Sequence, residues 1–243
     1  MSVNVVTARL GELIGERKIF VFLGESGAGK SELAINMAML LAEQGKKVRF
    51  FDLDQTKPLF RSRELQDMLR EKGVLFDTGR QFMDAPTIAE GVYDRLFEED
   101  VLTVLDVGGN AVGARSLGQL HAAWEGRAAA YMVANCYRPF SLNSVDLLTR
   151  MDEVAAAARF GSFEIISNPN FGAETVLADV MDGHAEILAM AQKSSYRVAA
   201  LTASPEFAAA VRASGGSGSA GVAESVHIMK MSYPVSGNGQ LVT

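Results

Sequence analysis

Short hydrophobic runs alternate with longer amphipathic segments along most of the chain. The runs are rich in β-branched and aromatic residues, which is typical of strands, and they occupy residues 18–23, 47–53, 101–106, 129–135, 162–167 and 196–201. A further short strand is compatible with residues 73–82.

The segments between these runs show helical periodicity, because apolar side chains recur every three or four residues and mark one face of a helix. Three such faces are made by Leu33, Met37, Leu40 and Leu41, by Leu148, Met151, Ala155 and Ala158, and by Val176, Val180, Ile187 and Met190. Strands that alternate with helices favour a parallel sheet covered on both faces. The pattern therefore predicts an α/β fold with a doubly wound, mainly parallel sheet flanked by helices.

Length and composition favour one large domain. The chain has 243 residues, and because 48% of them are hydrophobic it can bury a substantial core. We expect a single domain over residues 1–243, in which residues 1–17 form an N-terminal extension. The Gly- and Ser-rich residues 214–221 are typical of a flexible connector, and residues 234–243 of a loose tail.

Composition argues against several classes of function. No apolar run reaches the roughly 18 residues of a membrane helix, and the first residues lack the order of a signal peptide. We therefore expect a cytoplasmic protein without a membrane partner. The formal charge of −6 argues against nucleic acid as a partner. One cysteine and three dispersed histidines give no disulfide and no clustered metal site, so any metal is expected to arrive with a ligand.

A glycine-rich stretch follows the first predicted strand and precedes the first predicted helix. It fits the pattern G-x-x-x-x-G-K-[ST] and consists of Gly24, Glu25, Ser26, Gly27, Ala28, Gly29, Lys30 and Ser31. In this context the backbone N–H groups form an anion nest at a helix N-terminus. Lys30 is expected to meet the β- and γ-phosphates of a nucleotide, and the Ser31 hydroxyl to bind Mg²⁺. The alternative is a glycine-rich turn without a ligand.

Acidic residues follow two other predicted strands, where the carboxyl ends of a parallel sheet converge. Asp52 and Asp54 end the second strand, and Asp106 ends the strand over residues 101–106. Asp106 is a candidate to hold the metal through water, and Asp54 to orient an attacking water and to contribute to the Mg²⁺ site. Because Gly109 has no side chain, its N–H can approach a γ-phosphate closely.

The order of these motifs resembles the MinD/ParA/Mrp group of P-loop ATPases, which belong to the SIMIBI class and are relatives of the nitrogenase iron protein and of CobQ-like enzymes. The resemblance covers most of residues 18 to about 210. It implies bound ATP and Mg²⁺, with Asp54 positioning water and Asp106 binding the metal through water. It also implies that Asn168 reads the adenine edge and that Pro205 packs against the base. A guanine-reading N-K-x-D is absent, since residues 168–171 are Asn-Pro-Asn-Phe, so ATP is favoured over GTP.

The sequence departs from this group at one position of the loop. Many members carry a second lysine there, which reaches the partner's phosphates across a homodimer, whereas this chain has Glu25. A carboxylate near a phosphate is repelled unless a metal ion, a basic partner or solvent compensates. Three explanations fit: a different dimer, a cation from a protein partner, or slow hydrolysis. The basic residues Lys57, Arg61 and Arg63 are candidate substitutes, or a solvated basic stretch.

Two other residues have open roles. Cys136 is expected to be a buried structural cysteine, although a dimer could bring two thiols together. Arg138 follows a predicted strand, so it could face the nucleotide or a partner, or form a structural ion pair.

The preferred hypothesis is an Mg-ATP-binding ATPase that hydrolyses ATP slowly and acts as a switch on an unidentified protein partner, with a homodimer as the expected assembly. The first alternative is a small-molecule kinase or a carboxylate-activating enzyme of the CobQ or dethiobiotin synthetase type. The second is a non-hydrolysing, nucleotide-bound regulatory subunit.

Overall fold

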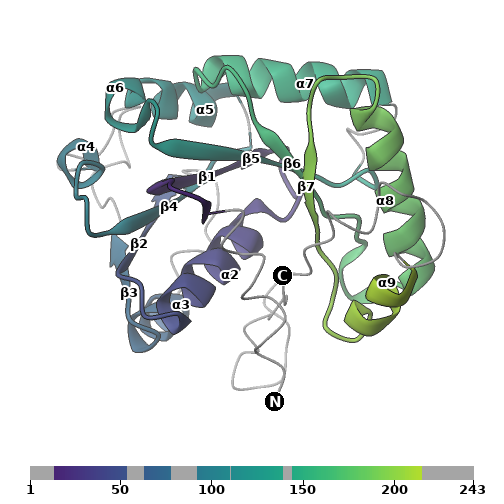
Figure 1. Cartoon of the computed structure of the whole chain (residues 1–243), viewed down its shortest axis with the longest axis horizontal. Coiled ribbons are helices and arrows are strands. Elements are labelled where there is room, and N and C mark those ends of the chain that lie inside the picture. Colours follow the sequence, from purple (N-terminus) through teal and green to yellow (C-terminus); the bar gives the residue numbers. More distant parts are fainter. Residues whose placement is uncertain (1–13, 54–62, 78–91, 110, 139–143, 215–243) are drawn as a thin grey trace.

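The computed structural model of the protein describes residues 14–53, 63–77, 92–109, 111–138 and 144–214. Within them, one sheet has seven strands in the order β3-β2-β4-β1-β5-β6-β7, and every pairing is parallel (Figure 1). The strands are β1 (Ile19–Gly24), β2 (Val48–Leu53), β3 (Val74–Asp77), β4 (Leu102–Val107), β5 (Ala128–Ala134), β6 (Glu164–Ser167) and β7 (Val198–Leu201).

Helices connect the strands and cover both faces of the sheet. They are α2 (Lys30–Glu43), α3 (Arg63–Glu71), α4 (Val92–Arg95), α5 (Ala111–Gly118), α6 (His121–Trp124), α7 (Ser144–Ala157), the 3₁₀ helix η2 (Gly172–Glu174), α8 (Leu177–Ala191) and α9 (Ala208–Ser214). In Figure 1, α2 and α3 lie on one side of the sheet, and α5, α6 and α7 on the other.

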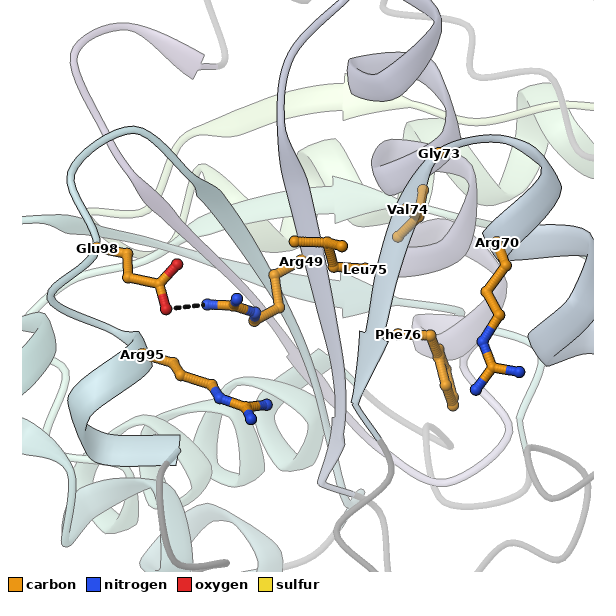
Figure 2. A pocket seen from close by; sticks show the side chains of 8 residues that line it. All are labelled: Arg49, Arg70, Gly73, Val74, Leu75, Phe76, Arg95 and Glu98. Carbon is orange, nitrogen blue, oxygen red and sulfur yellow. Dashed lines mark ion pairs between the residues drawn. The ribbon is translucent and has the colours of Figure 1, made fainter.

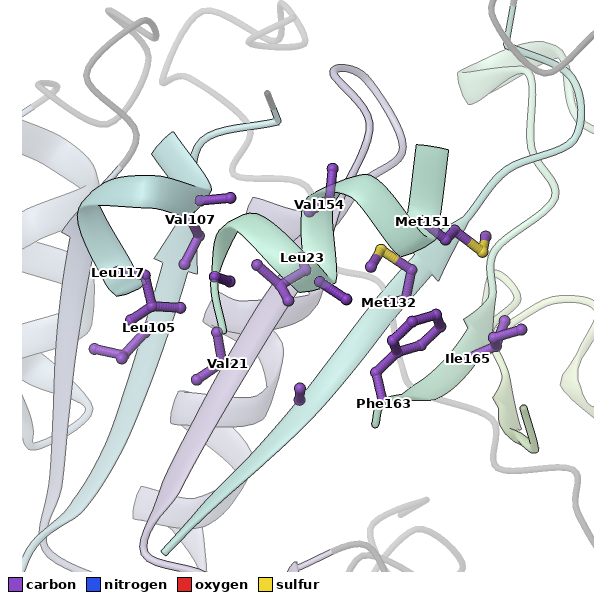
Figure 3. Close-up of a cluster of buried hydrophobic side chains, with 14 of the residues drawn as sticks. Val21, Leu23, Leu105, Val107, Leu117, Met132, Met151, Val154, Phe163 and Ile165 are labelled. Atoms are coloured by element: carbon purple, nitrogen blue, oxygen red, sulfur yellow. The ribbon is translucent and has the colours of Figure 1, made fainter. Parts of the chain in front are cut away.

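Most of the core in the described residues forms two apolar layers, one on each face of the sheet. Side chains alternate along a strand, so Val21 and Leu23 of β1 enter one layer, which side chains of α5 and α7 complete (Figure 3) and α8 also joins. Phe20 and Phe22 enter the other layer, with α2. Full burial of one such side chain contributes about 1.5–3 kcal/mol. The two layers thus fix β1 at the centre of the molecule.

Strand β1 is also the point where the strand order of the sheet reverses. It pairs with β4 on one side and β5 on the other, and β2 lies beyond β4. In an open parallel sheet such a reversal opens a crevice outside the carboxyl ends of the strands, where ligands bind. The fold therefore favours a site at the end of β1.

The structure confirms the predicted α/β fold and each of the predicted strands, including a short β3 within residues 73–82. It also confirms the three helices, which are α2, α7 and α8, but Val176 was wrongly placed on a buried face. Val176 precedes α8 as its extended N-cap residue and is 55% exposed.

Most of the predicted N-terminal extension (residues 1–17) and most of the predicted connector (residues 214–221) lie outside the described residues. The predicted tail (residues 234–243) lies entirely outside them. The single-domain organisation therefore stays a prediction. In the part of the chain that the structure describes, no helix has both the length and the apolar character needed to cross a bilayer.

Candidate functional site

The glycine-rich loop lies at the centre of the sheet edge, between the end of β1 and the start of α2. Gly24, Gly27 and Gly29 all have positive φ values, of 136°, 78° and 96°, and L-residues with a side chain rarely adopt such values. A Cβ on Gly24 would also lie 2.5 Å from the carbonyl oxygen of Val133 on β5. Main-chain geometry and the neighbouring strand therefore require the glycines that the motif contains.

Lys30 is buried although it carries a charge. It is 1% exposed, and its Nζ donates a hydrogen bond to the main-chain oxygen of Glu25 at 2.7 Å. The ammonium group of Lys30 therefore reaches back over the loop to the main chain of Glu25. Ser31 is also buried at the first turn of α2. These are the two positions at which the motif provides a phosphate-binding lysine and a metal-binding hydroxyl.

Asp106 lies next to the loop because of strand register. It pairs with Phe22 of β1 on one side and with Asp52 of β2 on the other, near the carboxyl ends of all three strands. The Asp106 side chain is fully buried, whereas Asp52 is only partly buried. A buried carboxylate at this point suits the metal role predicted for Asp106, because oxygen ligands are what Mg²⁺ prefers.

The turn after β4 touches the loop directly. A Cβ on Gly109 would lie 2.6 Å from the main-chain nitrogen of Ser26 and 2.9 Å from Lys30 Nζ. No side chain fits 2.6 Å from a main-chain nitrogen, so only glycine allows the main chain of this turn to approach Ser26 as closely as it does. The structure thus brings together Lys30, Ser31, Asp106 and Gly109, which sequence reasoning selected separately.

Asn168 lies beneath the loop and is nearly inaccessible. Its amide Nδ2 donates to the carbonyl of Ala28 at 2.7 Å, and its Oδ1 accepts a hydrogen bond from the Thr202 hydroxyl. The side chain thereby ties β6 and the end of β7 to the phosphate-binding loop. Its predicted contact with adenine stays a prediction, as does the predicted packing of the exposed Pro205 against the base.

Glu25 has a basic partner within the same chain. Its Oε1 lies 3.4 Å from Nε of Arg150 on α7, and the Glu25 side chain is only 13% exposed. Sequence reasoning missed Arg150, because it belongs to no motif and lies far along the chain. Lys57, Arg61 and the catalytic candidate Asp54 lie outside the described residues, as does the side chain of Arg63. Their predicted roles stay predictions.

Burial shifts the pKa values of Glu32, Cys136 and His184. Burial raises the pKa of Glu32, on the first turn of α2, to about 7. It also raises the pKa of the Cys136 thiol to about 12, with a smaller contribution from Glu186, so this thiol is protonated at neutral pH. His184 is shifted downward by burial, to a pKa of about 4, and its Nδ1 lies 2.9 Å from the Ser167 hydroxyl.

A separate hollow of about 580 Å³ lies by edge strand β3 (Figure 2). Its lining includes Arg70, Arg95 and Arg49, and Arg49 pairs with Glu98 at 2.8 Å. It lies beside the first half of β2, whereas the phosphate-binding loop follows the carboxyl end of β1. The hollow is therefore distinct from the candidate site. Among the described side chains, no group of three or more His, Cys, Asp or Glu residues is arranged to hold a metal ion.

The chain matches the sequence model of a known protein family. The sequence model of the CobQ/CobB/MinD/ParA nucleotide binding domain matches residues 19–193, which span the sheet from β1 to the end of α8. No curated protein sequence matches the chain.

Several solved structures are similar in fold. The signal recognition particle receptor FtsY from Elizabethkingia anophelis is 14% identical, with a TM-score of 0.51 over 81% of this chain and 63% of that chain. The cell division protein FtsY from Thermotoga maritima is 13% identical, with a TM-score of 0.54 over 76% and 61%. Chloroplast FtsY from Physcomitrella patens is 14% identical, with a TM-score of 0.53 over 80% and 65%. The chain thus spans less than two thirds of the length of each, and at these identities the likeness concerns the fold alone.

Proposed function

We propose that this chain, which belongs to the CobQ/CobB/MinD/ParA nucleotide binding domain family, binds Mg-ATP, hydrolyses it slowly and acts as a nucleotide switch on a protein partner. The family places it among the P-loop nucleotide-binding proteins of the SIMIBI class. The observation that carries the proposal is the contact between the Gly109 turn and the loop at Ser26 and Lys30. A phosphate group bound by the loop would therefore be next to a turn that can sense it.

The residues of the site fit a nucleotide with its metal. Successive N–H groups of the loop offer hydrogen bonds to the phosphates, and Lys30 can exchange its bond to Glu25 for one to a phosphate oxygen. Ser31 and Asp106 would hold Mg²⁺, which neutralises charge on the phosphates. Asp54 is proposed to orient the attacking water, and the Gly109 N–H to meet the γ-phosphate.

The switch would act through α5, which begins shortly after Gly109. Leu117 of α5 and Met151 of α7 belong to the same buried layer. Loss of the γ-phosphate removes the contact that orders the turn, so a shift there would reach the outer face of α5 and α7. We propose this face as the part of the molecule that changes between the ATP and ADP states.

ATP is proposed as the nucleotide because residues 168–171 do not form the guanine-reading N-K-x-D element. A homodimer is proposed from the family resemblance, and a cytoplasmic location from the apolar runs of the sequence, none of which is long enough for a membrane helix.

The test measures binding of ATP, ADP and GTP by calorimetry, together with phosphate release. We expect ATP to bind, Lys30→Ala to abolish binding, and Asp54→Ala to abolish hydrolysis while binding survives. Equal affinity of the Lys30 variant and the wild type would overturn the proposal. Turnover that requires a metabolite from a panel would instead favour a kinase or a carboxylate-activating enzyme, and tight binding without turnover a regulatory subunit.

A further inference from the structure

The side chain of Arg138 lies against the phosphate-binding loop. A Cβ on Gly27 would be 3.7 Å from Arg138 Nε, 3.8 Å from Cδ and 4.0 Å from Cζ. Gly27 also has a φ of 78°, so the loop presents bare main chain to the guanidinium group. Arg138 follows β5, which is the neighbour of β1 in the sheet. A cation from a different loop thus reaches the middle of the phosphate-binding turn.

The Nε of Arg138 is buried and has no hydrogen-bond acceptor among the residues that the structure describes. A buried donor left without an acceptor is unfavourable, and such groups in native proteins are usually paired with protein, water or a ligand. At this place the acceptor that suits a guanidinium group is a phosphate oxygen, because the two form charge-assisted hydrogen bonds. The position and chemistry of Arg138 therefore both favour an anionic ligand in the loop.

The segment that carries Arg138 is firmly held. Asn135 is buried, its Oδ1 accepts hydrogen bonds from the main-chain nitrogens of Tyr137 and Asn170, and its Nδ2 donates to the Asn170 carbonyl. The main-chain nitrogen of Arg138 donates to the Asn135 carbonyl at 3.3 Å. The Tyr137 ring stacks on Phe171 with 4.2 Å between centroids. These contacts hold the main chain of Arg138 in place, so less conformational entropy is lost when its guanidinium group binds a ligand.

The two arginines beside the loop differ in their surroundings. Arg150 is 49% exposed and pairs with the Glu25 carboxylate, so its charge offsets that of Glu25. Arg138 instead lies at Gly27 with its Nε buried.

From this difference we infer that Arg138 binds the phosphate chain of the nucleotide and supplies, from the same chain, the positive charge that position 25 does not. The inference rests on the proposed function, because it needs a nucleotide in the loop.

The experiment measures the ATP and ADP affinities of the full chain and of Arg138→Ala, Arg138→Gln, Arg138→Lys, Lys30→Ala and Arg197→Ala. Arg197 is an exposed arginine paired with Glu164 and serves as the matched control. We expect Arg138→Ala and Arg138→Gln to weaken ATP binding roughly ten- to hundred-fold, as loss of a hydrogen bond to a charged group does. Arg138→Lys should recover part of the affinity because it keeps the charge, and Arg197→Ala should bind within about two-fold of wild type.

A salt titration separates a phosphate contact from mere support of the loop. The affinity of the wild type should fall more steeply with salt than that of Arg138→Gln, because one charge pair is lost in the variant. Thermal unfolding without nucleotide shows whether each variant is folded.

The inference is overturned if Arg138→Gln binds like wild type, or if its salt dependence is unchanged. If the wild type does not bind ATP, or Lys30→Ala binds equally well, the proposed function itself fails. Loss of binding in Lys30→Ala together with normal binding in Arg138→Ala refutes this inference alone.

Discussion

The side-chain amide of Asn168 donates a hydrogen bond to the main-chain oxygen of Ala28, 140 positions away in the sequence. Its other amide atom, Oδ1, accepts a hydrogen bond from Thr202. One buried side chain therefore joins the phosphate-binding loop to the ends of two strands. These two hydrogen bonds attach the loop to the sheet and help to keep its conformation.

Replacing Asn168 by Ala should lower the free energy of unfolding by about 2 kcal/mol, because buried partners on two elements lose their hydrogen bonds. Urea denaturation measures the change. Thr202→Val is the matched control, since it removes the Thr202 hydroxyl, which bonds to Oδ1 and to the Ser167 carbonyl, but keeps the bond to Ala28, and it should cost less. Wild-type stability in Asn168→Ala would mean that this side chain does not support the loop.

Gly109→Ala should abolish tight ATP binding while the protein stays folded. A Cβ there would meet the Ser26 nitrogen at 2.6 Å and Lys30 Nζ at 2.9 Å, so the turn or the loop must shift. Calorimetry should show at least a ten-fold weaker affinity, as a loss of about 1.4 kcal/mol gives. Gly161→Ala is the control, because a Cβ at Gly161 meets no atom within 4 Å. Equal ATP affinity in the two variants would refute the role of the Gly109 turn.

The pairing of Glu25 with Arg150 should matter for ligand binding more than for stability. Arg150→Ala leaves a carboxylate near the phosphates without its partner at 3.4 Å, so ATP affinity should fall several-fold. The Glu25→Gln, Arg150→Ala double variant should regain most of that affinity, since the repulsion is gone. A double-mutant cycle measures the coupling. A double variant as weak as Arg150→Ala would show that Arg150 acts by some other route.

The contribution of His184 to stability should fall as the pH drops from about 6.5 toward 4, while Glu32, whose pKa burial raises to about 7, acts in the opposite sense. Burial lowers the pKa of His184 from 6.5 to about 4, so in this range the unfolded chain binds a proton that the folded chain does not. The linked loss is up to about 3 kcal/mol and is absent above the unfolded pKa. In urea denaturation from pH 7.5 to 4.5, His184→Gln should become more stable relative to the wild type as the pH falls, because it lacks the His184 loss. The same slope in both proteins would exclude His184 as the source.

The strands and main helices could be predicted from sequence because their signal is local. Hydrophobic runs and three-to-four-residue spacing persist across each element, and the structure confirms them. Val176 was misplaced because an apolar residue just before a helix matches the helical spacing but points away from the core. The glycine-rich loop could also be predicted from the sequence, since its glycines, Lys30 and Ser31 all lie within residues 24–31.

The sequence by itself determined which segments form the strands of a parallel sheet and which loop carries the phosphate-binding motif, because periodicity and contiguous motifs depend only on near neighbours. Only the tertiary structure decided what surrounds that loop. Arg150 pairs with Glu25, Arg138 reaches Gly27, and Asn168 bonds to Ala28. Each of these contacts joins residues that chain topology brings together at the carboxyl end of the sheet. Their partners depend on which strands are neighbours, and no local pattern encodes that.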